Sequence, residues 1–456
     1  MSEQNYDIIV IGGGPAGQHI ATAAAAAGKT VAITEGYAYG GACPLRGCDP
    51  KMVLHGVADA SARMHQLCGK GVVEEATISW ADLMEWKRTF TEPVPGGSVE
   101  KLERKGVDTY HGYASFVDAH RVRFGEGAGA PVVRGETIVI AAGMRPAELD
   151  IPGADLMIDS EGFLDMDDMP DEMVIVGGGY IGTGFANLAC LLGCRKVEVV
   201  VADPYPAAQF DPDLAVALQR ANEDRGIVFY TATKATAVAK ADGRLRVTVE
   251  NDAGQRRELT TRRVVNCTGR VPVLDRLDLE AAGVNYDRRK GIAVSSKMAT
   301  NVSHIYAVGD CADSGLPLTP VATHEAQLLV DNLFHDGNRH RDYAPIPTVC
   351  FSDPPIASVG MTHEEARRSP RNLRINHADA TDWFHARRLN SPVYAYKVIL
   401  DADDDTVLGA HLVGPTAHEL INVFTLAIHH QLTCTQLRHQ LWAYPTAASD
   451  IARMVG

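Results

Sequence analysis

Short apolar runs separated by glycine-rich turns and longer helical stretches form a repeating pattern in this chain. Residues 8–11 form an apolar run, glycines follow, an alanine-rich stretch extends to Gly28, and a second apolar run covers 30–34. Buried parallel strands are typically continuous apolar runs of this length, and the alanine-rich stretch between them favours a helix. We therefore predict a strand, helix and strand unit at the start of the chain.

The same pattern returns in the second third of the sequence. A strand from Met173 leads into the turn Gly177-Gly178-Gly179, a second apolar helix follows, and residues 197–201 form another apolar strand. Three more apolar runs end on a glycine, which is typical of strands that stop at a bound nucleotide: 138–143, 264–269 and 305–309. The repeat predicts two Rossmann-like domains, each built to bind a dinucleotide.

The last quarter of the chain has a different pattern. After about residue 342 the sequence becomes β-rich, with a hairpin around 401–405 and a helix from about His418 to His430. It contains no nucleotide motif, so we expect packing or dimerisation to be its role. The predicted fold class is α/β, with two Rossmann-like dinucleotide-binding domains and a C-terminal α+β dimerisation domain.

Length and charge limit the kinds of protein that fit. The 456 residues exceed one hydrophobic core and predict several domains, and a net charge of -14 argues against a nucleic acid partner. No apolar run has the length of a membrane span, and the first residues lack the basic start of a signal peptide. We expect a soluble, cytoplasmic protein without a membrane partner. Nine cysteines, an odd number, argue against a structural disulfide framework.

The turn after the first strand carries the first candidate binding site. It contains three glycines in a row, and Glu35 ends the second strand eighteen residues after the last glycine of the motif. Such glycines allow a pyrophosphate to approach a helix N-terminus, and the acid can accept a hydrogen bond from a ribose hydroxyl. The residues predicted to bind a dinucleotide here are Gly12, Gly14, Pro15, Ala16, Gly17 and Glu35.

Cys43 and Cys48 stand five positions apart just after this unit. On a regular helix they would be about 7.5 Å apart along the axis, and a disulfide tolerates roughly 7 Å between Cα atoms. The segment must therefore bend before any helix begins, and Pro44 and Gly47 are suited to that bend. The pair is a candidate redox centre, and the alternative is two buried thiols in a glycine-rich loop.

Taken together, these segments resemble the pyridine nucleotide-disulfide oxidoreductases of the glutathione reductase and lipoamide dehydrogenase type over nearly the whole chain. Residues 43–51 are particularly similar to the redox segment of glutathione reductase. Three further segments match landmarks of the family: 318–322, 359–362 and 408–411.

The resemblance implies an enzyme, an NAD(P)H-dependent flavoprotein disulfide oxidoreductase. It implies FAD in the first domain, NAD(P)H in the second, and a homodimer in which the C-terminal domain completes the partner's active site. The domains expected on this basis are the first part of the FAD domain at 1–152, the NAD(P) domain at 153–272, the second, central part of the FAD domain at 273–341, and the dimerisation domain at 342–456.

The resemblance also implies roles for individual residues. Cys48 would touch the flavin, Cys43 would exchange with substrate, and Lys51 would lie near the reactive nitrogen of the flavin. A cation one helical turn from Cys48 would favour a thiolate, although Lys51 could instead be a solvated surface lysine. Asp49 tends to raise the pKa of the Cys48 thiol and Arg46 tends to lower it, and the sequence leaves open which is closer.

Further residues are expected to bind the cofactors. For FAD these are Gly41, Ala42, Lys51, Ala114, Ala142, Gly143, Asp310 and Thr319. For the nicotinamide nucleotide they are Gly177, Gly179, Tyr180, Ile181, Gly182, Asp203 and Gly269. Tyr180 matches the tyrosine that covers the flavin in relatives, and simple packing at a helix start is the alternative. We expect no metal site.

The C-terminal tail departs from the family pattern. Reductases of the family end in a His-Pro motif with a Glu that orients the histidine, whereas this chain has Tyr444-Pro445 and, at the acid position, Ser449. A neutral tyrosine cannot take a proton from a thiol near pH 7 as imidazole does. We therefore hypothesise a substrate whose leaving thiol is already acidic, because such a thiol needs no proton. His439 could be a displaced base, although a surface or packing role is expected for it.

Two other departures affect the flavin and the nucleotide. Gly184 stands where the family usually has a Glu paired with the lysine, so Lys51 would be an unpaired cation and would raise the flavin potential. The strand that ends at Val201 lacks both the usual acid and the arginines that hold a 2′-phosphate. Asp203 is close enough to replace that acid, so NAD is favoured over NADP.

The leading hypothesis is electron transfer from NAD(P)H through FAD and the Cys43-Cys48 disulfide to a small acceptor, with a disulfide as the first choice. A second hypothesis is mercuric-like metal-ion reduction, because mercuric reductase also has a tyrosine in place of the histidine. The chain ends without the cysteine pair of that enzyme's tail. A third hypothesis is a dithiol oxidase with weak nicotinamide use, and a fourth is a non-catalytic flavoprotein that senses redox state.

Overall fold

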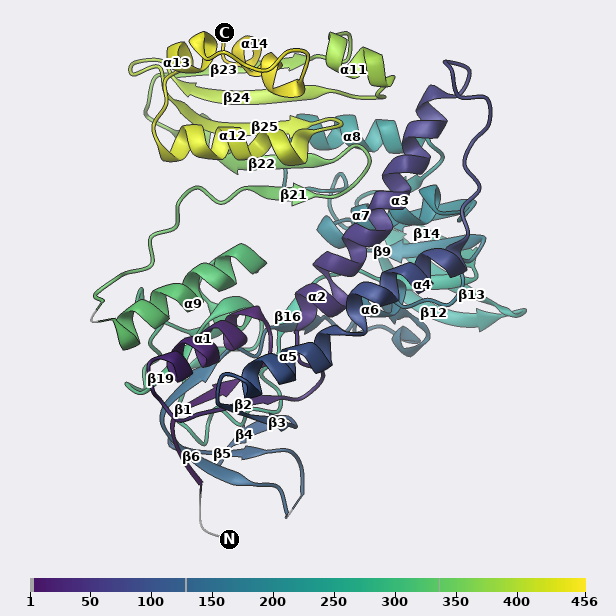
Figure 1. Ribbon diagram of the computed structural model, residues 1–456. Coiled ribbons are helices and arrows are strands. Elements are labelled where there is room, and N and C mark those ends of the chain that lie inside the picture. Colours follow the sequence, from purple (N-terminus) through teal and green to yellow (C-terminus); the bar gives the residue numbers. More distant parts are fainter. Residues whose placement is uncertain (1–3, 128, 336) are drawn as a thin grey trace. The chain divides into compact units, whose positions relative to one another are not determined.

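A computed structural model describes residues 4–127, 129–335 and 337–456 of the chain (Figure 1). The chain forms two compact units, each assembled from three segments. The first unit contains the residues up to 53, 85–147 and 270–342, and the second contains 54–84, 148–269 and 343–456. Two helices begin in one unit and continue into the other, α3 (Cys48–Leu67) and α4 (Trp80–Thr91).

The first unit is organised around a sheet whose central strands are parallel, in the order β3-β2-β1-β6, with β19 beside β6. These strands are β1 (Gln4–Ile11), β2 (Val31–Glu35), β3 (Val107–His111), β6 (Val132–Ile140) and β19 (Ile305–Ala307). Antiparallel β5 (Arg121–Phe124) and β4 (Ala114–Phe116) extend the sheet beyond β6. The predicted strands at 8–11, 30–34 and 138–140 therefore occur in one sheet.

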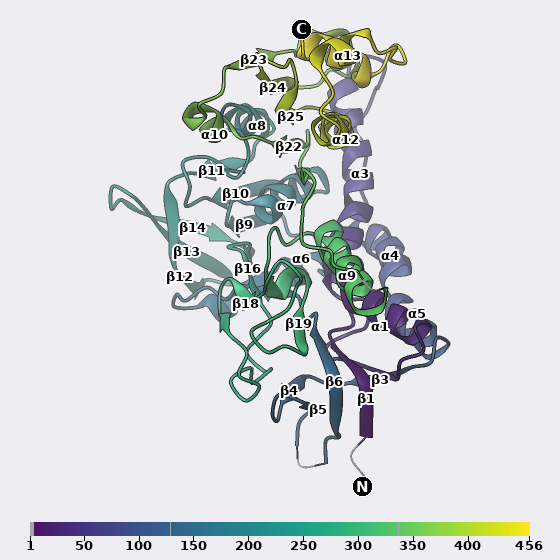
Figure 2. The same cartoon turned by 90° about the vertical axis from the view of Figure 1, so that its left-hand side faces the viewer.

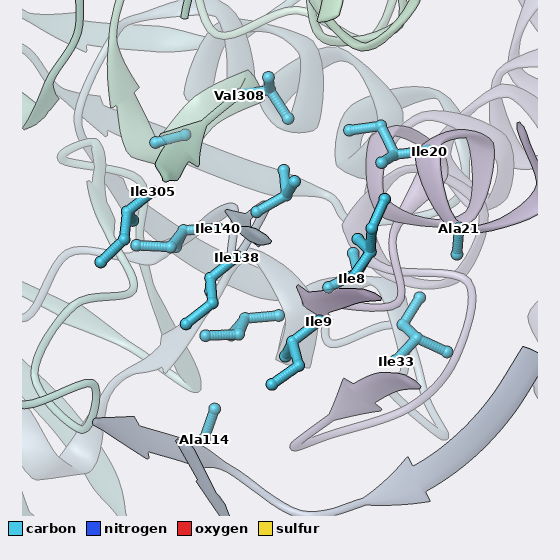
Figure 3. Close-up of a cluster of buried hydrophobic side chains, with 14 of the residues drawn as sticks. Ile8, Ile9, Ile20, Ala21, Ile33, Ala114, Ile138, Ile140, Ile305 and Val308 are labelled. Carbon is cyan, nitrogen blue, oxygen red and sulfur yellow. The ribbon is translucent and has the colours of Figure 1, made fainter. Parts of the chain in front are cut away.

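The core of the first unit lies on both faces of this sheet. Ile9, Ile33 and Ile138 are fully buried, and Ile20 from the first helix packs into the same cluster (Figure 3). This distribution explains why the strands are apolar without interruption, since parallel strands covered on both faces have no solvent side.

Helices and short strands complete the first unit. The helix α1 packs against α9 (Figure 1). The helices are α1 (Pro15–Ala26), α2 (Ala42–Arg46), α5 (Val94–Glu103) and α9 (Thr319–Phe334). The remaining elements are β7 (Met144–Pro146), β16 (Arg270–Pro272), β17 (Tyr286–Asp287), β18 (Gly291–Ala293), β20 (Ala312–Asp313) and the 3-10 turn η2 (Gly309–Cys311).

The second unit contains another parallel sheet, in the order β11-β10-β9-β15-β8. Its strands are β8 (Ile158–Asp159), β9 (Glu172–Val176), β10 (Lys196–Val200), β11 (Val228–Tyr230) and β15 (Arg263–Asn266). A three-stranded antiparallel meander packs on one face: β12 (Thr233–Ala241), β13 (Arg244–Asn251) and β14 (Arg256–Thr261). The helices of this part are α6 (Ser160–Leu164), α7 (Tyr180–Leu191) and α8 (Pro212–Asp224), with the turn η1 (Ala154–Leu156).

The last quarter of the chain forms an antiparallel sheet in the order β21-β22-β25-β24-β23. Its strands are β21 (Thr348–Cys350), β22 (Ile356–Gly360), β23 (Leu373–Asp379), β24 (Ala395–Asp401) and β25 (Val407–Val413). The sheet lies between α8 on one side and α12 (Ala417–His429) on the other (Figure 2). The other elements are α10 (His363–Arg368), α11 (Phe384–Leu389), α13 (Cys434–His439), η3 (Ala447–Asp450) and α14 (Ile451–Met454).

The architecture matches the predicted fold class. Two parallel nucleotide-type sheets precede an α+β segment, and the predicted hairpin and final long helix occur as β24-β25 and α12. The residue boundaries assigned to the four domain segments stay predictions. Among the described residues, no helix is both long and apolar enough to span a bilayer.

Candidate active site

The first glycine-rich turn brings the backbones of two strands and one helix close together. A Cβ atom on Gly12 would lie 2.2 Å from the carbonyl oxygen of Ala141, and one on Gly17 would lie 2.0 Å from the oxygen of Gly12. No side chain fits at either position, so glycine is required where β1, β6 and α1 meet. Gly14 is the N-cap residue of α1 and has no side-chain cap, so the helix presents its first amide groups to a ligand.

Glu35 lies at the end of β2 and faces this turn. Its two carboxylate oxygens accept hydrogen bonds from the backbone N–H groups of Gly13 and Tyr37, each at 2.8 Å. These bonds fix the carboxylate beside the glycine turn, where the sequence predicts a ribose acceptor. Tyr37 was not among the predicted residues, although its position two residues after the acid was the available signal.

The carboxyl ends of β6 and β19 meet at the same edge of the sheet. Ala142 and Gly143 follow β6 directly, and a Cβ atom on Gly143 would meet no atom within 4 Å. Asp310 follows β19, and burial raises the pKa of its carboxyl group while the charge of Arg270 opposes that effect. In open α/β sheets, ligands bind at this edge where the strand order reverses. Ala114 is buried at the start of β4.

The two cysteines lie on two consecutive helices rather than on one helix. Cys43 is in α2, α3 begins at Cys48, and Gly47 breaks the helix between them with φ −143° and ψ −101°. The expectation that the chain bends before any helix begins is wrong, because one helical turn precedes the break. Gly47 also keeps a negative φ, and the left-handed conformation occurs instead at Gly41, with φ 75°, where a Cβ would lie 2.6 Å from Gly14.

The break at Gly47 brings the two sulfur atoms into contact. Both cysteines are free thiols in this structure, and the Cys43 thiol donates a hydrogen bond to the Cys48 sulfur. That bond is the largest cause of the lowered pKa of Cys48, which is about 6, and of the raised pKa of Cys43. The charge of a mono-deprotonated pair therefore resides on Cys48.

Thr319 is the third member of this cluster. It is the first residue of α9, and its hydroxyl oxygen lies 3.7 Å from the Cys48 sulfur and also forms a side-chain hydrogen bond with Cys43. The sequence predicted Thr319 only as a cofactor-binding residue. Its contact with both sulfur atoms depends on the fold bringing α9 to α2, which residue spacing does not reveal.

The charged neighbours of Cys48 answer the question that the sequence left open. Lys51 lowers the Cys48 pKa and Asp49 raises it, while the Arg46 guanidinium lies 4.1 Å from the centre of the Tyr37 ring. Asp49 is thus among the charges that act on the Cys48 thiol, whereas the Arg46 guanidinium lies over the Tyr37 ring. Lys51 takes part in an interaction, and the expected effect of the missing Glu at position 184 on the flavin potential stays a prediction.

The second glycine-rich turn has the same construction as the first. A Cβ on Gly177 would lie 2.3 Å from the oxygen of Cys267, and one on Gly182 would lie 1.8 Å from the oxygen of Gly177. Gly179 and Gly269 have no atom within 4 Å of such a Cβ. An added side chain would therefore clash where the strands and the helix pack, and there is free space on the side from which a dinucleotide would approach. Asp203 is exposed just after β10, and Ile181 is in the first turn of α7.

Tyr180 and Gly184 lie on α7 of the second unit. Tyr180 is the first helical residue, is 36% exposed, and packs edge-on against Phe210 with ring centres 5.1 Å apart. A Cβ on Gly184 would lie 3.1 Å from the Phe351 carbonyl oxygen, so the helix lies tightly against the residue that follows β21.

The tail residues are placed at the surface of the second unit. The Tyr444 side chain is 80% exposed, and the Ser449 hydroxyl donates a hydrogen bond to the Thr446 carbonyl at 2.6 Å. His439 ends α13 and is also exposed. The structure thus gives Ser449 a local backbone partner and no role in orienting Tyr444 within the described residues.

Both glycine turns fit a dinucleotide. Each combines an uncapped helix N-terminus with an N-cap glycine, where an added Cβ would meet no atom closer than 3.8 Å, and with a strand end that carries an open glycine, Gly143 or Gly269. The first turn adds the fixed carboxylate of Glu35. Within the described residues, no group of three or more His, Cys, Asp or Glu side chains is arranged to hold a metal ion.

Comparison with known families places the chain in a class. Residues 6–326 match the pyridine nucleotide-disulphide oxidoreductase family, and residues 346–455 match the dimerisation domain of the same enzymes. The chain belongs to the pyridine nucleotide-disulphide oxidoreductase family, and it is an NAD(P)H-dependent flavoprotein disulfide oxidoreductase. Members of this class use FAD and a pyridine nucleotide, and the dimerisation domain supports a homodimer.

Individual relatives cover the whole chain. A dihydrolipoyl dehydrogenase of Haloferax volcanii is 31% identical over 98% of this chain and 94% of its own length. A glutathione reductase of a Nostoc species is 30% identical over 99% of both chains. Among solved structures, the HOCl-induced flavoprotein disulfide reductase RclA from Escherichia coli superposes with a TM-score of 0.88 at 26% identity, covering 99% of each chain. A Cu(II) complex of RclA gives a TM-score of 0.89 at 26% identity, covering 100% of this chain and 99% of that one.

Proposed function

We propose that this enzyme passes electrons from NAD(P)H through FAD and the Cys43-Cys48 pair to a small disulfide whose leaving thiol is acidic. The observation that carries the proposal is the polarised sulfur pair, in which Cys48 holds a thiolate with a pKa of about 6 beside the protonated Cys43. FAD, when bound, supplies the two-electron step between nicotinamide and sulfur.

Residues of the first unit hold FAD in this proposal. The uncapped start of α1 receives the pyrophosphate, Glu35 receives a ribose hydroxyl, and Asp310 receives a hydroxyl further along the cofactor. Gly41, Ala42, Ala114 and the open Gly143 shape the cavity around it. In the second unit, the turn at Gly177–Gly182 holds the nicotinamide nucleotide, with Tyr180 at its helix start.

The proposed nucleotide is NADH. Asp203 is exposed shortly after β10, which ends at Val200, and a carboxylate at this edge accepts from a ribose hydroxyl and repels a 2′-phosphate. The test compares kcat/KM for NADH and NADPH in the wild type and in Asp203→Asn. We expect the ratio to favour NADH and to fall in the variant, and a preference for NADPH in the wild type would contradict the assignment.

The acceptor is proposed from the tail. An exposed tyrosine at 444 offers no imidazole-like base near pH 7, so release of an alkyl thiolate would be slow, by about 10² to 10⁴ relative to an assisted release. A homodimer would bring the Tyr444 of one chain to the sulfur pair of its partner, as the family resemblance implies. We expect an activated aromatic disulfide to be reduced much faster than oxidised glutathione. Equal or faster turnover of oxidised glutathione would exclude the acidic-thiol substrate.

An anaerobic titration separates this function from a dithiol oxidase and from a redox sensor. Adding NADH or NADPH to the purified flavoprotein should bleach the flavin and then produce long-wavelength absorbance from the Cys48 thiolate beside it. Bleaching by dithiols alone would indicate a dithiol oxidase. No bleaching by either reagent would indicate a flavoprotein that senses redox state without turnover.

A second candidate function is reduction of a soft metal ion. The specific observation in its favour is the 26% identity, over the full chain, to the RclA that was solved as a Cu(II) complex. Thiolates are suitable ligands for reduced copper. NADH-dependent formation of Cu(I), followed with a Cu(I)-specific chelator, tests it. We expect this activity to be lost in Cys43→Ser if the sulfur pair is the donor, and activity retained in that variant would assign it to the flavin alone.

A further inference from the structure

The reduced sulfur pair needs a base, because Cys43 must lose its proton before it can attack a disulfide. The family's histidine position is occupied here by Tyr444, and a phenol is not a base of the imidazole kind. The proton that must move has one acceptor already in contact with it, since the Cys43 thiol donates its hydrogen bond to the Cys48 sulfur.

We propose that the Cys48 sulfur is the base that takes the Cys43 proton, and that Thr319 is the positioning residue that holds this sulfur in place. The proposal rests on the proposed function of the same pair. Its geometric basis is a three-membered cluster in which the Thr319 hydroxyl, 3.7 Å from the Cys48 sulfur, also contacts Cys43.

The positions of the three groups are independent of the tail. Cys43 is held by the short helix α2, Cys48 starts α3, and Thr319 starts the sixteen-residue helix α9. At the start of α9, Pro320 has no N–H to donate and Leu318 has no polar side chain. The Thr319 hydroxyl is therefore the side-chain group of these three residues that can donate to a sulfur atom. The other charged groups that act on Cys48 are Lys51, which favours the thiolate, and Asp49, which opposes it.

The chemistry balances without an external base. The pair, reduced by NAD(P)H through FAD, carries one proton and one negative charge. The proton moves from Cys43 to Cys48, the Cys43 thiolate attacks one sulfur of the disulfide, and the first thiolate leaves. A mixed disulfide with Cys43 remains. Cys48 then attacks Cys43, its proton goes to the second leaving sulfur, and the products are the Cys43-Cys48 disulfide, one thiol and one thiolate. An acidic first leaving thiol is therefore sufficient.

Thr319 affects the free energy of the proton transfer from Cys43 to Cys48. Its hydroxyl can donate to either sulfur, so it stabilises the charge on Cys48 before the proton moves and on Cys43 afterwards. An alcohol does not titrate in this pH range, which makes Thr319 a fixed donor rather than a second base.

The pH profile of the first half-reaction tests the base role. The full-length FAD enzyme is reduced, mixed with an activated aromatic disulfide, and followed by stopped flow in the wild type and in Cys48→Ser. We expect the wild-type rate to be flat from about pH 7 to pH 8.5, because the proton moves inside the pair above the Cys48 pKa of about 6. The Cys48→Ser rate should rise about tenfold per pH unit, because Cys43 then loses its proton only to solvent.

Two outcomes would overturn the base role. A wild-type rate that also rises tenfold per pH unit would show that solvent or another group takes the proton. A flat profile in Cys48→Ser would show that a base other than Cys48 serves Cys43.

The role of Thr319 is tested by the long-wavelength absorbance of the dithiol-reduced enzyme as a function of pH. Thr319→Val removes the hydroxyl and keeps the shape, and Thr319→Ser restores the hydroxyl. Thr323→Val is the control for local helix packing, because it removes a hydroxyl that donates to the Thr319 carbonyl and not to a sulfur atom. We expect the midpoint to rise by about one pH unit in Thr319→Val, which is a tenfold lower ratio of thiolate to thiol at a given pH, and to return in Thr319→Ser. Thr323→Val should keep the wild-type midpoint.

An unchanged midpoint in Thr319→Val, or no recovery in Thr319→Ser, would refute the positioning role even if activity falls. These results differ from a failure of the proposed function. If the sulfur pair does not exchange electrons with the flavin, the wild-type enzyme itself gives no long-wavelength band on reduction.

Discussion

At the scale of single residues, the reactivity of Cys48 results from four neighbours whose contributions have known signs. Cys43, Thr319 and Lys51 lower the pKa of its thiol, and desolvation and Asp49 raise it. The lowering effects dominate, so Cys48 is a thiolate above about pH 6 and a thiol below it. Activity that depends on this thiolate should therefore be retained at neutral pH and lost as the pH falls through 6.

Substitution of the two charged neighbours should move this midpoint in opposite directions. In Lys51→Gln the reduced enzyme loses a favourable charge, so we expect the midpoint to rise by about one pH unit and the ratio of thiolate to thiol at a given pH to fall about tenfold. In Asp49→Asn the midpoint should fall below 6. The midpoint is read from the long-wavelength absorbance of the reduced enzyme, and a shift of equal sign in both variants would contradict the assigned charge effects.

The sequence predicted the cysteine pair and its lysine, because these residues are neighbours along the chain and their spacing carries the signal. It could not rank Asp49 against Arg46, since the side chain of Arg46 turns to the Tyr37 ring, which belongs to the segment after β2. It also could not find Thr319 as a partner of both sulfurs, because that contact depends on where α9 begins in space.

At the scale of elements, the glycine turns were predictable in full detail and the helix contacts were not. Gly12 and Gly177 are required by local turns that the motif encodes. The contact of Gly184 with the Phe351 carbonyl joins α7 to the segment after β21, and no local sequence pattern predicts this contact. Gly184 therefore has a packing role in addition to replacing the family's Glu.

Two glycine substitutions separate packing from helix propensity. Gly56 lies within α3 with no atom within 4 Å of an added Cβ, so Gly56→Ala should raise the free energy of unfolding by about 0.5–1 kcal/mol. Gly184→Ala should stabilise less than Gly56→Ala, because the same gain in helix propensity is offset by the Cβ lying 3.1 Å from the Phe351 carbonyl oxygen. Denaturant unfolding of both variants measures the difference, and a Gly184→Ala protein stabilised as much as Gly56→Ala would contradict the tight contact.

The contact also affects how a glutamate at position 184 can be interpreted. In Gly184→Glu any change of the flavin potential would combine the new charge with this close contact. Gly184→Ala is the matched control, because it introduces the same Cβ without the carboxylate. We expect the potential of Gly184→Glu to be lower than that of Gly184→Ala, and equal potentials would show that the carboxylate does not act on the flavin.

A buried ion pair links α8 to the antiparallel sheet of the second unit. The Lys397 ammonium on β24 donates to both carboxylate oxygens of Asp211 at 2.8 Å and to Asp213 at 2.5 Å, and the Lys397 and Asp211 side chains are 1% and 0% exposed. Removing one partner would leave a buried charge uncompensated, which is costly even where the intact pair contributes little.

We therefore expect Lys397→Met to lower the free energy of unfolding by about 3–5 kcal/mol. Lys240→Met is the control, because Lys240 is exposed on the meander and such a substitution should stay within about 0.5 kcal/mol. Denaturant unfolding compares the two variants. A Lys397→Met protein as stable as the control would show that the buried Asp211 carboxylate does not need this ammonium.

At the scale of the whole molecule, the chain joins two nucleotide-binding folds of the same construction to one redox pair and a dimerisation domain. The repeated turns and the change of pattern after residue 342 made this organisation predictable. The acceptor was not predictable in the same way, because no motif of the chain specifies an acceptor.

The central claim is that the Cys43-Cys48 pair stores two electrons beyond those stored by the flavin. Anaerobic titration of the oxidised flavoprotein with dithionite measures this directly, with the flavin spectrum as indicator. We expect the wild type to take up four electrons per flavin, which is two molecules of dithionite. Cys43→Ser should take up two electrons, which is one molecule of dithionite. A wild type that is fully reduced by a single equivalent per flavin would contradict the account.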